Sequence, residues 1–195
     1  MGTIAEILRY LIQTASALYL FAVLLRLLLQ LARADFYNPL SQFVVRLTNP
    51  LLIPLRRLVP PVGRIDSGSI VLALVVQTVA ALAVLALHNA LSVNPLLVIV
   101  WSAVAILALV VKIYFFAILA LIIFSWVAPQ AHHPALALLY QLTEPVMAPF
   151  RRVLPPAGGL DLSPILVFVT INVLEILLRG LAAQLGLPRG LMFPI

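Results

Sequence analysis

Residues 47–66 read LTNPLLIPLRRLVPPVGRID, and residues 142–161 read LTEPVMAPFRRVLPPAGGLD. The two stretches align without a gap at a displacement of 95 residues, and ten of their twenty positions are identical. The identical positions include four prolines, two adjacent arginines, a glycine and a closing aspartate. Such self-similarity is the mark of an internal repeat, which decides how the rest of the chain is divided.

The repeat extends beyond these stretches into the apolar sequence before them. At the same displacement Tyr19 falls on Tyr114, and Pro39 falls on Pro134. The repeating unit is therefore a long apolar helix, a loop rich in proline and arginine, and a second long apolar helix. The first unit occupies residues 1–95 and the second occupies residues 96–195.

The composition indicates that this chain folds in a membrane. Hydrophobic residues make up 64% of the 195 residues and charged residues only 9%, and the mean hydropathy is +1.19. A water-soluble domain of this size cannot cover so much apolar surface, whereas lipid accepts it. Four segments approach the roughly 20 apolar residues that cross a bilayer. We expect spans at residues 11–31, 70–91, 106–126 and 165–185, and apolar residues 96–105 predict a long or tilted third helix.

The number of helices in each unit sets the relative orientation of the units. Two helices per unit give both units the same orientation, so we predict an all-α membrane protein of four transmembrane helices in two parallel repeats. Both loops, residues 32–69 and 127–164, then lie on one side. Seven arginines fall near that side and three near the opposite one. The positive-inside rule therefore places the loops in the cytoplasm and both termini on the opposite side of the membrane.

Each loop carries the signals of a short amphipathic helix lying along the membrane surface. Asn38-Pro39 reads as an N-cap followed by proline at the first helical position, and an apolar stripe follows it. Later prolines favour a bent segment, and the closing aspartate is placed to cap the next membrane helix. The expected structural motif comprises Pro39, Pro50, Pro54, Pro60, Pro61 and Asp66, with the repeat mates Pro134, Pro145, Pro149, Pro155, Pro156 and Asp161.

The arginines beside these prolines are candidates for binding. A guanidinium near an anionic leaflet contributes on the order of 1 kcal/mol to membrane attachment. The plain interpretation is that each loop only holds two helix ends at lipid phosphates, and the alternative is that the loops form a docking surface for proteins. The candidate residues for lipid or partner binding are Arg46, Arg56, Arg57, Arg151 and Arg152.

A few polar residues fall inside the expected spans. Arg26 lies about 7.5 Å from the end of the first span at helical rise, so we expect its side chain to snorkel to the interface. Glu175 lies deep in the fourth span and needs a partner. We expect a polar layer that either locks helices together or forms a permeation or proton path. Its residues are Gln77, Lys112, Asn172, Glu175 and Arg179.

The sequence offers no arrangement that predicts catalysis or a cofactor. The absence of cysteine excludes disulfides and thiolate sites. His88 is isolated and His132-His133 lacks a third ligand, so we expect no metal site. Since the arginines are not interleaved with exposed aromatic residues, we expect anionic lipid headgroups, and not nucleic acid, as the partner. We expect neither enzyme activity nor catalytic residues.

Several short motifs resemble those of a known family. They are Asp35-Phe36-Tyr37-Asn38-Pro39, Asn49-Pro50, Pro54-Leu55-Arg56-Arg57 and Pro60-Pro61, with a second copy in residues 144–161. On these residues the whole chain resembles the YggT family of small bacterial inner-membrane proteins, in its two-repeat proteobacterial form. The resemblance implies a connection with osmotic or ion-stress tolerance and, through the related YlmG proteins, with cell division and nucleoid distribution. A plastid relative is similar to factors that assist haem attachment to cytochrome b6. No catalytic residues are implied, because the family has no agreed molecular activity.

Two functions therefore stand side by side. The first is a non-enzymatic membrane scaffold or assembly factor whose loops engage anionic lipid or unidentified membrane or cytoplasmic proteins, in cell division, envelope or stress physiology. The second is an ion-linked transport or ion-stress component built on the polar layer. Four helices are few for a transporter, so the second function requires a homo-oligomer.

Overall fold

The computed structural model describes residues 2–63, 65–90, 92–127, 133–154 and 161–188. Within those ranges the fold is wholly α-helical apart from one isolated backbone bridge in a turn. Four helices are long and apolar enough to cross a membrane: α1 (Thr3–Leu31), α3 (Ser67–Leu87), α4 (Pro95–Val127) and α6 (Ser163–Gln184). Two shorter amphipathic helices, α2 (Pro39–Leu58) and α5 (Pro134–Val153), lie between the long helices of each repeat.

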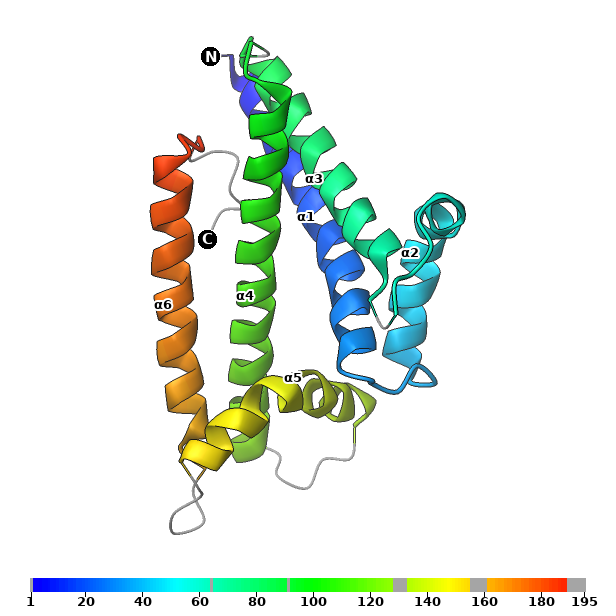
Figure 1. The fold of residues 1–195 in the computed structure, drawn as a ribbon, viewed down its shortest axis with the longest axis vertical. Helices are drawn as coiled ribbons and strands as arrows, with labels where there is room; N and C mark the ends of the chain where they lie inside the picture. The colour runs from blue at the N-terminus through cyan, green and yellow to red at the C-terminus, as the bar shows by residue number, and fades with distance from the viewer. Residues whose placement is uncertain (1, 64, 91, 128–132, 155–160, 189–195) are drawn as a thin grey trace.

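The two repeats have the same orientation. In Figure 1, α1 and α4 run downward while α3 and α6 run back upward, so the four long helices form two antiparallel pairs. In Figure 1, α5 crosses the lower end of the bundle, whereas α2 rises beside α1 and α3 from the point where α1 finishes. The predicted class is confirmed: this is an all-α, multi-pass membrane protein of four spans in two tandem repeats.

Three apolar clusters hold the helices together. The largest joins α1, α2, α3, α4 and α5 through buried side chains that include Leu24, Leu52, Ala73, Ile113 and Leu142. Another packs α4, α5 and α6 together through Ile118, Met147 and Val167. The third cluster lies at the end opposite α5, where the indole Nε1 of Trp101 donates to the carbonyl of Leu185 at 3.0 Å. Because van der Waals packing and polar contacts are what hold helices together in lipid, these clusters fix the frame from which α2 and α5 project.

Several expected span boundaries need adjustment. The first span begins at Thr3 and not at residue 11, and the second begins at Ser67 and not at residue 70. The second span was expected to continue to Leu91, but α3 ends at Leu87 because Asn89 adopts the left-handed region, with φ of 53°. The third span begins eleven residues earlier than expected, at Pro95, where Asn94 Oδ1 accepts from the backbone N–H of Leu96 at 2.9 Å. The result is the long third helix that the apolar run predicted.

The α2 and α5 helices remain helical through their internal prolines. Pro50 and Pro54 lie inside α2, and Pro145 and Pro149 lie inside α5. Each proline removes one backbone donor, which bends a helix without always ending it. Figure 1 shows the bend directly, since part of α2 is seen from the side and part end-on. The expected bent segment is therefore present, as one helix per repeat.

Candidate functional site

The first turn of each amphipathic helix is fixed by a side-chain cap. Asn38 Oδ1 accepts from the backbone N–H of Leu40 at 3.0 Å, with Pro39 at the first helical position. In the second repeat, Nδ1 of His133 takes the same role toward the N–H of Ala135 at 3.2 Å. The predicted start of α2 is thus confirmed, and one histidine of the His132-His133 pair is a helix cap.

A charged contact closes the first loop where the chain turns from α2 into α3. Arg56 Nε donates to Asp66 Oδ1 at 3.2 Å, its Nη2 donates to Oδ2, and Ser69 Oγ also donates to Oδ2. The Asp66 side chain is 1% exposed. Burial raises the pKa of this carboxyl, but the hydrogen bonds from Arg56 and Ser69 and the Arg56 charge together bring it below its ordinary value. Gly63, with φ of 60°, supplies the turn between them.

The second repeat forms the same contact with an additional partner. Arg151 Nε donates to Asp161 Oδ2 at 3.0 Å, and Arg151 Nη1 donates to Glu144. Burial raises the pKa of Asp161, whereas hydrogen bonds from Ser163 and from Arg151 lower it, and the net pKa lies below the ordinary value. Because Asp161 is 34% exposed, this pair is better screened by solvent than its counterpart in the first repeat.

The two closing aspartates do not cap in the same way. Asp66 is at the N-cap position of α3, and its carboxylate accepts mainly from the side chains of Arg56 and Ser69. Asp161 lies one residue before the N-cap of α6 and accepts from the N–H of Ser163 at 2.9 Å. The aspartates expected to cap the next helix therefore act mainly as ion-pair partners of an arginine in the same loop. We call these ion pairs, Arg56–Asp66 and Arg151–Asp161, the arginine clasps. Of the other motif prolines, Pro60 and Pro61 follow α2, whereas Pro155 and Pro156 lie outside the described residues.

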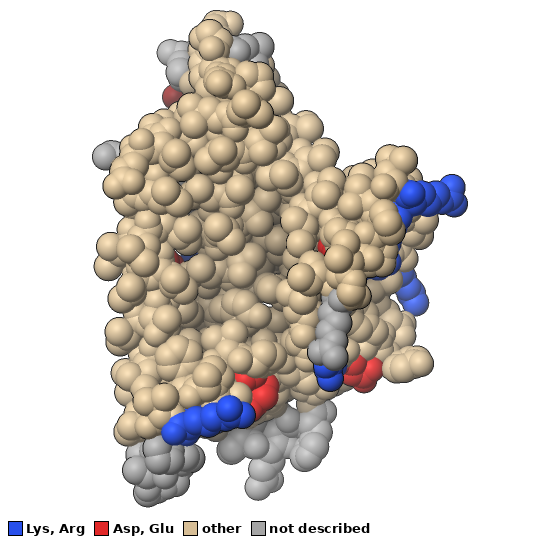
Figure 2. Space-filling model, in the orientation of Figure 1, with Lys and Arg blue, Asp and Glu red and all other residues tan. Residues whose placement is uncertain are grey.

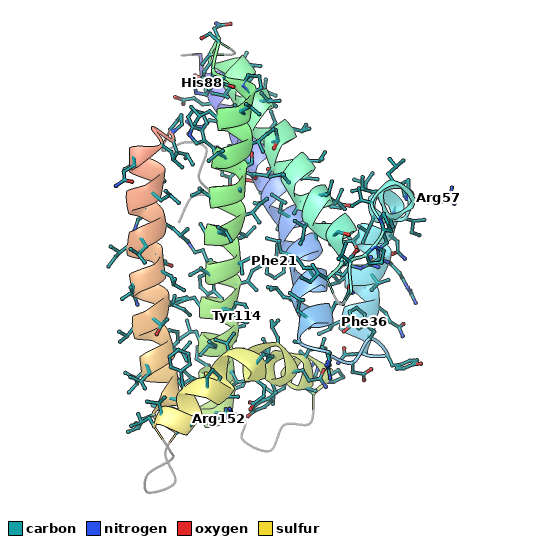
Figure 3. The ribbon with its side chains drawn as sticks, in the orientation of Figure 1. Phe21, Phe36, Arg57, His88, Tyr114 and Arg152 are labelled. Carbon is teal, nitrogen blue, oxygen red and sulfur yellow. The ribbon has the colours of Figure 1, made fainter. Side chains whose placement is uncertain are left out.

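The predicted binding arginines separate into two groups. Arg56 and Arg151 are held by the aspartates of their own loops. Arg46, Arg57 and Arg152 are exposed and form no ion pair within the described ranges. Figure 3 shows Arg57 and Arg152 near the far ends of α2 and α5. On the face in Figure 2, basic side chains gather over the outer part of α2 and along α5, while the long helices are almost wholly uncharged.

Arg26 is a residue of this site whose role the sequence did not reveal. Its side chain does not extend to the lipid interface as expected, because α2 folds over it and leaves it 6% exposed. Nη1 donates to Thr48 Oγ1 at 2.7 Å and to Asn49 Oδ1 at 2.8 Å, with a longer contact to the Val45 carbonyl at 3.5 Å. One sequence feature could have indicated a special role for Arg26. The second repeat lacks this arginine, and Leu121 occupies the matching position.

The two loops contact one another. The backbone N–H of Asp35 donates to Gln141 Oε1 at 2.8 Å, and Asn38 Nδ2 donates to the Pro134 carbonyl at 2.8 Å. These bonds join the chain just before α2 to the first half of α5. The two amphipathic helices therefore meet near their N-terminal ends.

The residues of the expected polar layer are only partly brought together. Lys112 on α4 interacts electrostatically with Glu175 on α6, and Glu175 lies 3.9 Å from Arg179. Asn172 is exposed and its Nδ2 donates to the Phe168 carbonyl of its own helix. Gln77 is buried on α3, and its Oε1 has no hydrogen-bond partner among the described residues.

The family model described as CCB3/YggT matches the chain twice, at residues 5–87 and 100–182. The chain belongs to the CCB3/YggT family. The two matches reproduce the displacement of 95 residues found in the sequence, and each covers one helix, loop, helix unit. The family resemblance drawn from the loop motifs is thereby confirmed.

Relatives in this family share both repeats. The chain is 47% identical over 184 residues to an uncharacterized protein of Pseudomonas aeruginosa, with 93% of each chain covered. It is 35% identical over 189 residues to YggT of Escherichia coli K12, covering 96% of this chain and 95% of that protein. A protein of Vibrio alginolyticus is 40% identical over 162 residues, covering 82% and 86%. No solved structure matches the chain.

Proposed function

We propose that this protein is a non-enzymatic scaffold or assembly factor of the bacterial inner membrane. In this proposal α2 and α5 lie at the cytoplasmic face, where the exposed arginines engage anionic headgroups and the exposed apolar residues engage partner proteins. The orientation follows from the excess of arginine at this end of the bundle.

One observation carries the proposal: the two amphipathic helices end in the same pair of features. Each ends in an exposed arginine, Arg57 or Arg152, followed at once by an exposed apolar side chain. These are Leu58, 80% exposed, and Val153, 76% exposed. Exposed apolar residues beside basic ones favour a surface that sits partly in the headgroup layer and partly against protein.

The experiment uses photo-crosslinking residues placed singly at Leu58, Val153 and Asn94. Asn94 is the control, because it is exposed at the opposite end, between α3 and α4. We expect discrete protein or lipid adducts from the first two positions in native membranes, and their loss on Arg57→Glu or Arg152→Glu. The proposal is wrong if all three positions give the same adducts, or if adducts at Leu58 and Val153 survive both charge reversals.

The structure favours Arg57 and Arg152 over Arg56 and Arg151 for such tests. Substitution of Arg56 or Arg151 also breaks a clasp to Asp66 or Asp161, so loss of binding would be confused with loss of structure. Arg57 and Arg152 make no ion pair in the described part of the chain, and their reversal leaves both clasps in place.

A second candidate is an ion-linked transport component, favoured by the interaction between Lys112 and Glu175 across α4 and α6. Charged residues inside spans are rare and often mark ion pathways. Ion flux in proteoliposomes that is abolished by Glu175→Gln or Lys112→Met would support this function over the scaffold. Flux equal to that of empty liposomes would remove it.

A further inference from the structure

The two loops differ in charge although they share their motif. Residues 32–69 contain five arginines and two aspartates, whereas residues 127–164 contain two arginines, one glutamate and one aspartate. The first loop is therefore strongly basic and the second is neutral, apart from histidine. Since each loop forms a 20-residue amphipathic helix at matching positions, the excess charge of the first loop is not needed to form that helix.

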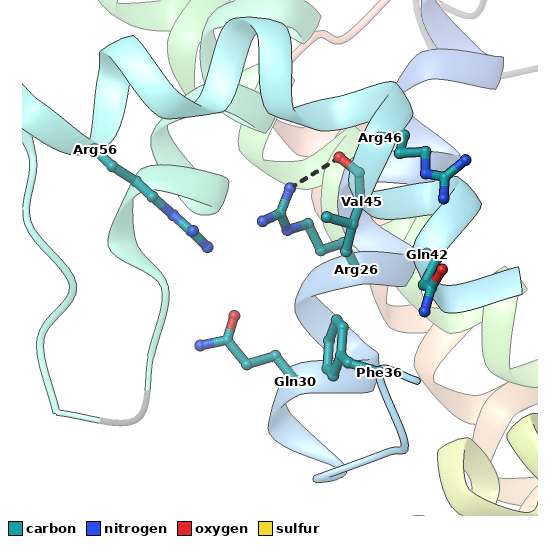
Figure 4. A pocket seen from close by; sticks show the side chains of 7 residues that line it. All are labelled: Arg26, Gln30, Phe36, Gln42, Val45, Arg46 and Arg56. Atoms are coloured by element: carbon teal, nitrogen blue, oxygen red, sulfur yellow. Dashed lines mark hydrogen bonds between the residues drawn. The ribbon is translucent and has the colours of Figure 1, made fainter. Parts of the chain in front are cut away.

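Two arginines of the first loop, Arg46 and Arg56, line an open cleft between α1 and α2 together with Arg26 of α1. The cleft has a volume of about 570 Å³, in the range of small-ligand sites, and is lined by Arg26, Gln30, Phe36, Gln42, Val45, Arg46 and Arg56. Figure 4 shows the guanidinium groups of Arg26 and Arg56 pointing toward one another across the hollow, with the Gln30 amide beside them and Arg46 at the far rim.

Arg26 is the cation that most requires a partner. It is buried, and its hydrogen bonds go to the neutral acceptors Thr48, Asn49 and Val45. All three start from Nη1, so Nε and Nη2 have no hydrogen-bond partner within the described residues. The nearby carboxylate, Asp66, is already held by Arg56. A buried charge without a counter-ion is costly, and two like charges facing one hollow increase that cost.

The corresponding place in the second repeat has lost these features. Leu121 stands at the position of Arg26, and Gln141 stands at the position of Arg46. Glu144 stands at the position of Asn49 and neutralises Arg151. The second repeat therefore forms its ion pair between arginine and aspartate without counterparts of Arg26 and Arg46. These two arginines are not required for that ion pair.

We propose that this cleft binds a phosphate group, held by Arg26, Arg56 and Gln30, with Arg46 at its entrance. Nε and Nη2 of Arg26 can bind a phosphate through paired, charge-assisted hydrogen bonds. Arg56, whose Nε and Nη2 are held by Asp66, can donate from Nη1, and the Gln30 amide can donate one more. Phe36 and Val45 offer an apolar wall to a glycerol backbone or another organic substituent. The inference rests on the proposed function, because that function places the cleft at the level of the lipid headgroups. It adds one specific phosphate site in the first repeat.

The test measures binding to the purified full-length protein in a non-ionic detergent at constant ionic strength, by titration calorimetry. Three probes are compared: dihexanoyl phosphatidylglycerol, inorganic phosphate, and dihexanoylglycerol, which has the chains without the phosphate. Tighter binding of the phosphatidylglycerol identifies a lipid headgroup as the ligand, and equal binding of inorganic phosphate identifies a soluble phosphate. If dihexanoylglycerol binds as tightly as phosphatidylglycerol, or if no phosphate probe binds, the proposal is overturned.

The key variant is Arg26→Leu, which replaces a buried charge by the residue found at the matching position of the second repeat, Leu121. We expect it to weaken phosphate binding about tenfold or more, because a charge-assisted hydrogen bond is lost. Arg33→Gln and Arg179→Gln are matched controls, because both arginines are exposed, lie outside the cleft and are not among the proposed binding arginines. We expect affinities within about twofold of the native value, since they contribute only long-range attraction. Equal losses in all three variants would overturn the proposal in favour of diffuse attraction.

A second variant keeps the test independent of the folding of Arg26→Leu. Gln30→Ser combined with Arg46→Gln copies Ser125 and Gln141 of the second repeat and leaves Arg26 in place. We expect about a threefold or greater loss of affinity from this pair, because one donor and one peripheral charge are removed. Unchanged affinity in both cleft variants would contradict the site. These measurements need no membrane or partner, so their failure is distinguishable from failure of the crosslinking at Leu58 and Val153.

Discussion

The carboxylate of Asp66 accepts two hydrogen bonds from the guanidinium of Arg56, which lies ten residues earlier in the chain, and this contact closes the loop between α2 and α3. Arg151 and Asp161 repeat the contact in the second unit, at the same separation. The clasp sets the angle at which each amphipathic helix returns to the next span. It therefore determines where Arg57 and Arg152, the adjacent exposed arginines, are presented.

Arg56→Gln is expected to destabilise the protein by about 2 kcal/mol, because it leaves the buried Asp66 carboxylate without its cation. Arg151→Gln should cost less than about 1 kcal/mol, since Asp161 is 34% exposed and better hydrated. The measurement is reversible unfolding in mixed micelles, with Arg57→Gln as the control that leaves both clasps intact. Equal losses for Arg56→Gln and Arg57→Gln would contradict the structural role of the clasp.

The pH dependence follows from the lowered pKa of Asp66. A carboxyl whose pKa is lower in the folded state stabilises that state above its unfolded pKa, and the contribution is lost as the pH falls through the folded pKa. We expect stability to be flat from neutral pH down to about 5 and to fall below about 4, near the ordinary Asp value. Asp66→Asn should be less stable at neutral pH, and its difference from the native protein should shrink in acid. A constant difference would show that the charge of Asp66 is irrelevant.

The contact between the loops predicts crosslinking across the two repeats. Because the chain has no native cysteine, Asp35→Cys combined with Gln141→Cys gives a clean pair at positions joined by a hydrogen bond. A short bifunctional maleimide should join residues 35 and 141 in native membranes, whereas cysteines at residues 57 and 152, which lie far apart in Figure 3, should not be joined. Crosslinking is read from the shift of a fragment after cleavage between the repeats. Failure of the first pair to react would mean that α2 and α5 do not meet.

The pairing of Glu175 is tested by comparing its two cationic neighbours. Glu175→Leu should lower stability by about 1 kcal/mol, typical of a polar contact between membrane helices. Lys112→Met should have a similar effect, because it removes the interaction that joins α4 to α6. Arg179→Leu should have little effect, since Arg179 is 62% exposed and lies 3.9 Å from Glu175 on the same helix. Equal thermal midpoints for the native protein and Glu175→Leu would exclude an interhelical lock.

Much of the fold could be predicted because its signals are local or repeated. Apolar runs of membrane length gave the four spans, and the displacement of 95 residues gave the parallel units. Asn38-Pro39 gave the start of α2. The start of α4 was placed too late even though Asn94-Pro95 is the same start signal, because the apolar run that follows it is longer than a bilayer requires.

The parts of the site that could not be predicted depend on contacts between distant segments. The burial of Arg26 results from α2 folding back over α1, and no local spacing encodes how far that fold reaches. The bond between Asp35 and Gln141 joins residues that are not repeat mates, so comparison of the two units could not reveal it. Distance from a helix end predicted a snorkelling Arg26 because that reasoning considers only lipid and water as surroundings.

The most direct test of the account is accessibility labelling of single cysteines at residues 57, 152 and 94 in the cysteine-free chain. A membrane-impermeant maleimide is applied to spheroplasts and, separately, to inverted inner-membrane vesicles. The account predicts that residues 57 and 152 react only in the inverted vesicles and that residue 94 reacts only in the spheroplasts. Labelling of residues 57 and 152 from opposite sides of the membrane would contradict the parallel arrangement of the two units and the single cytoplasmic surface built on it.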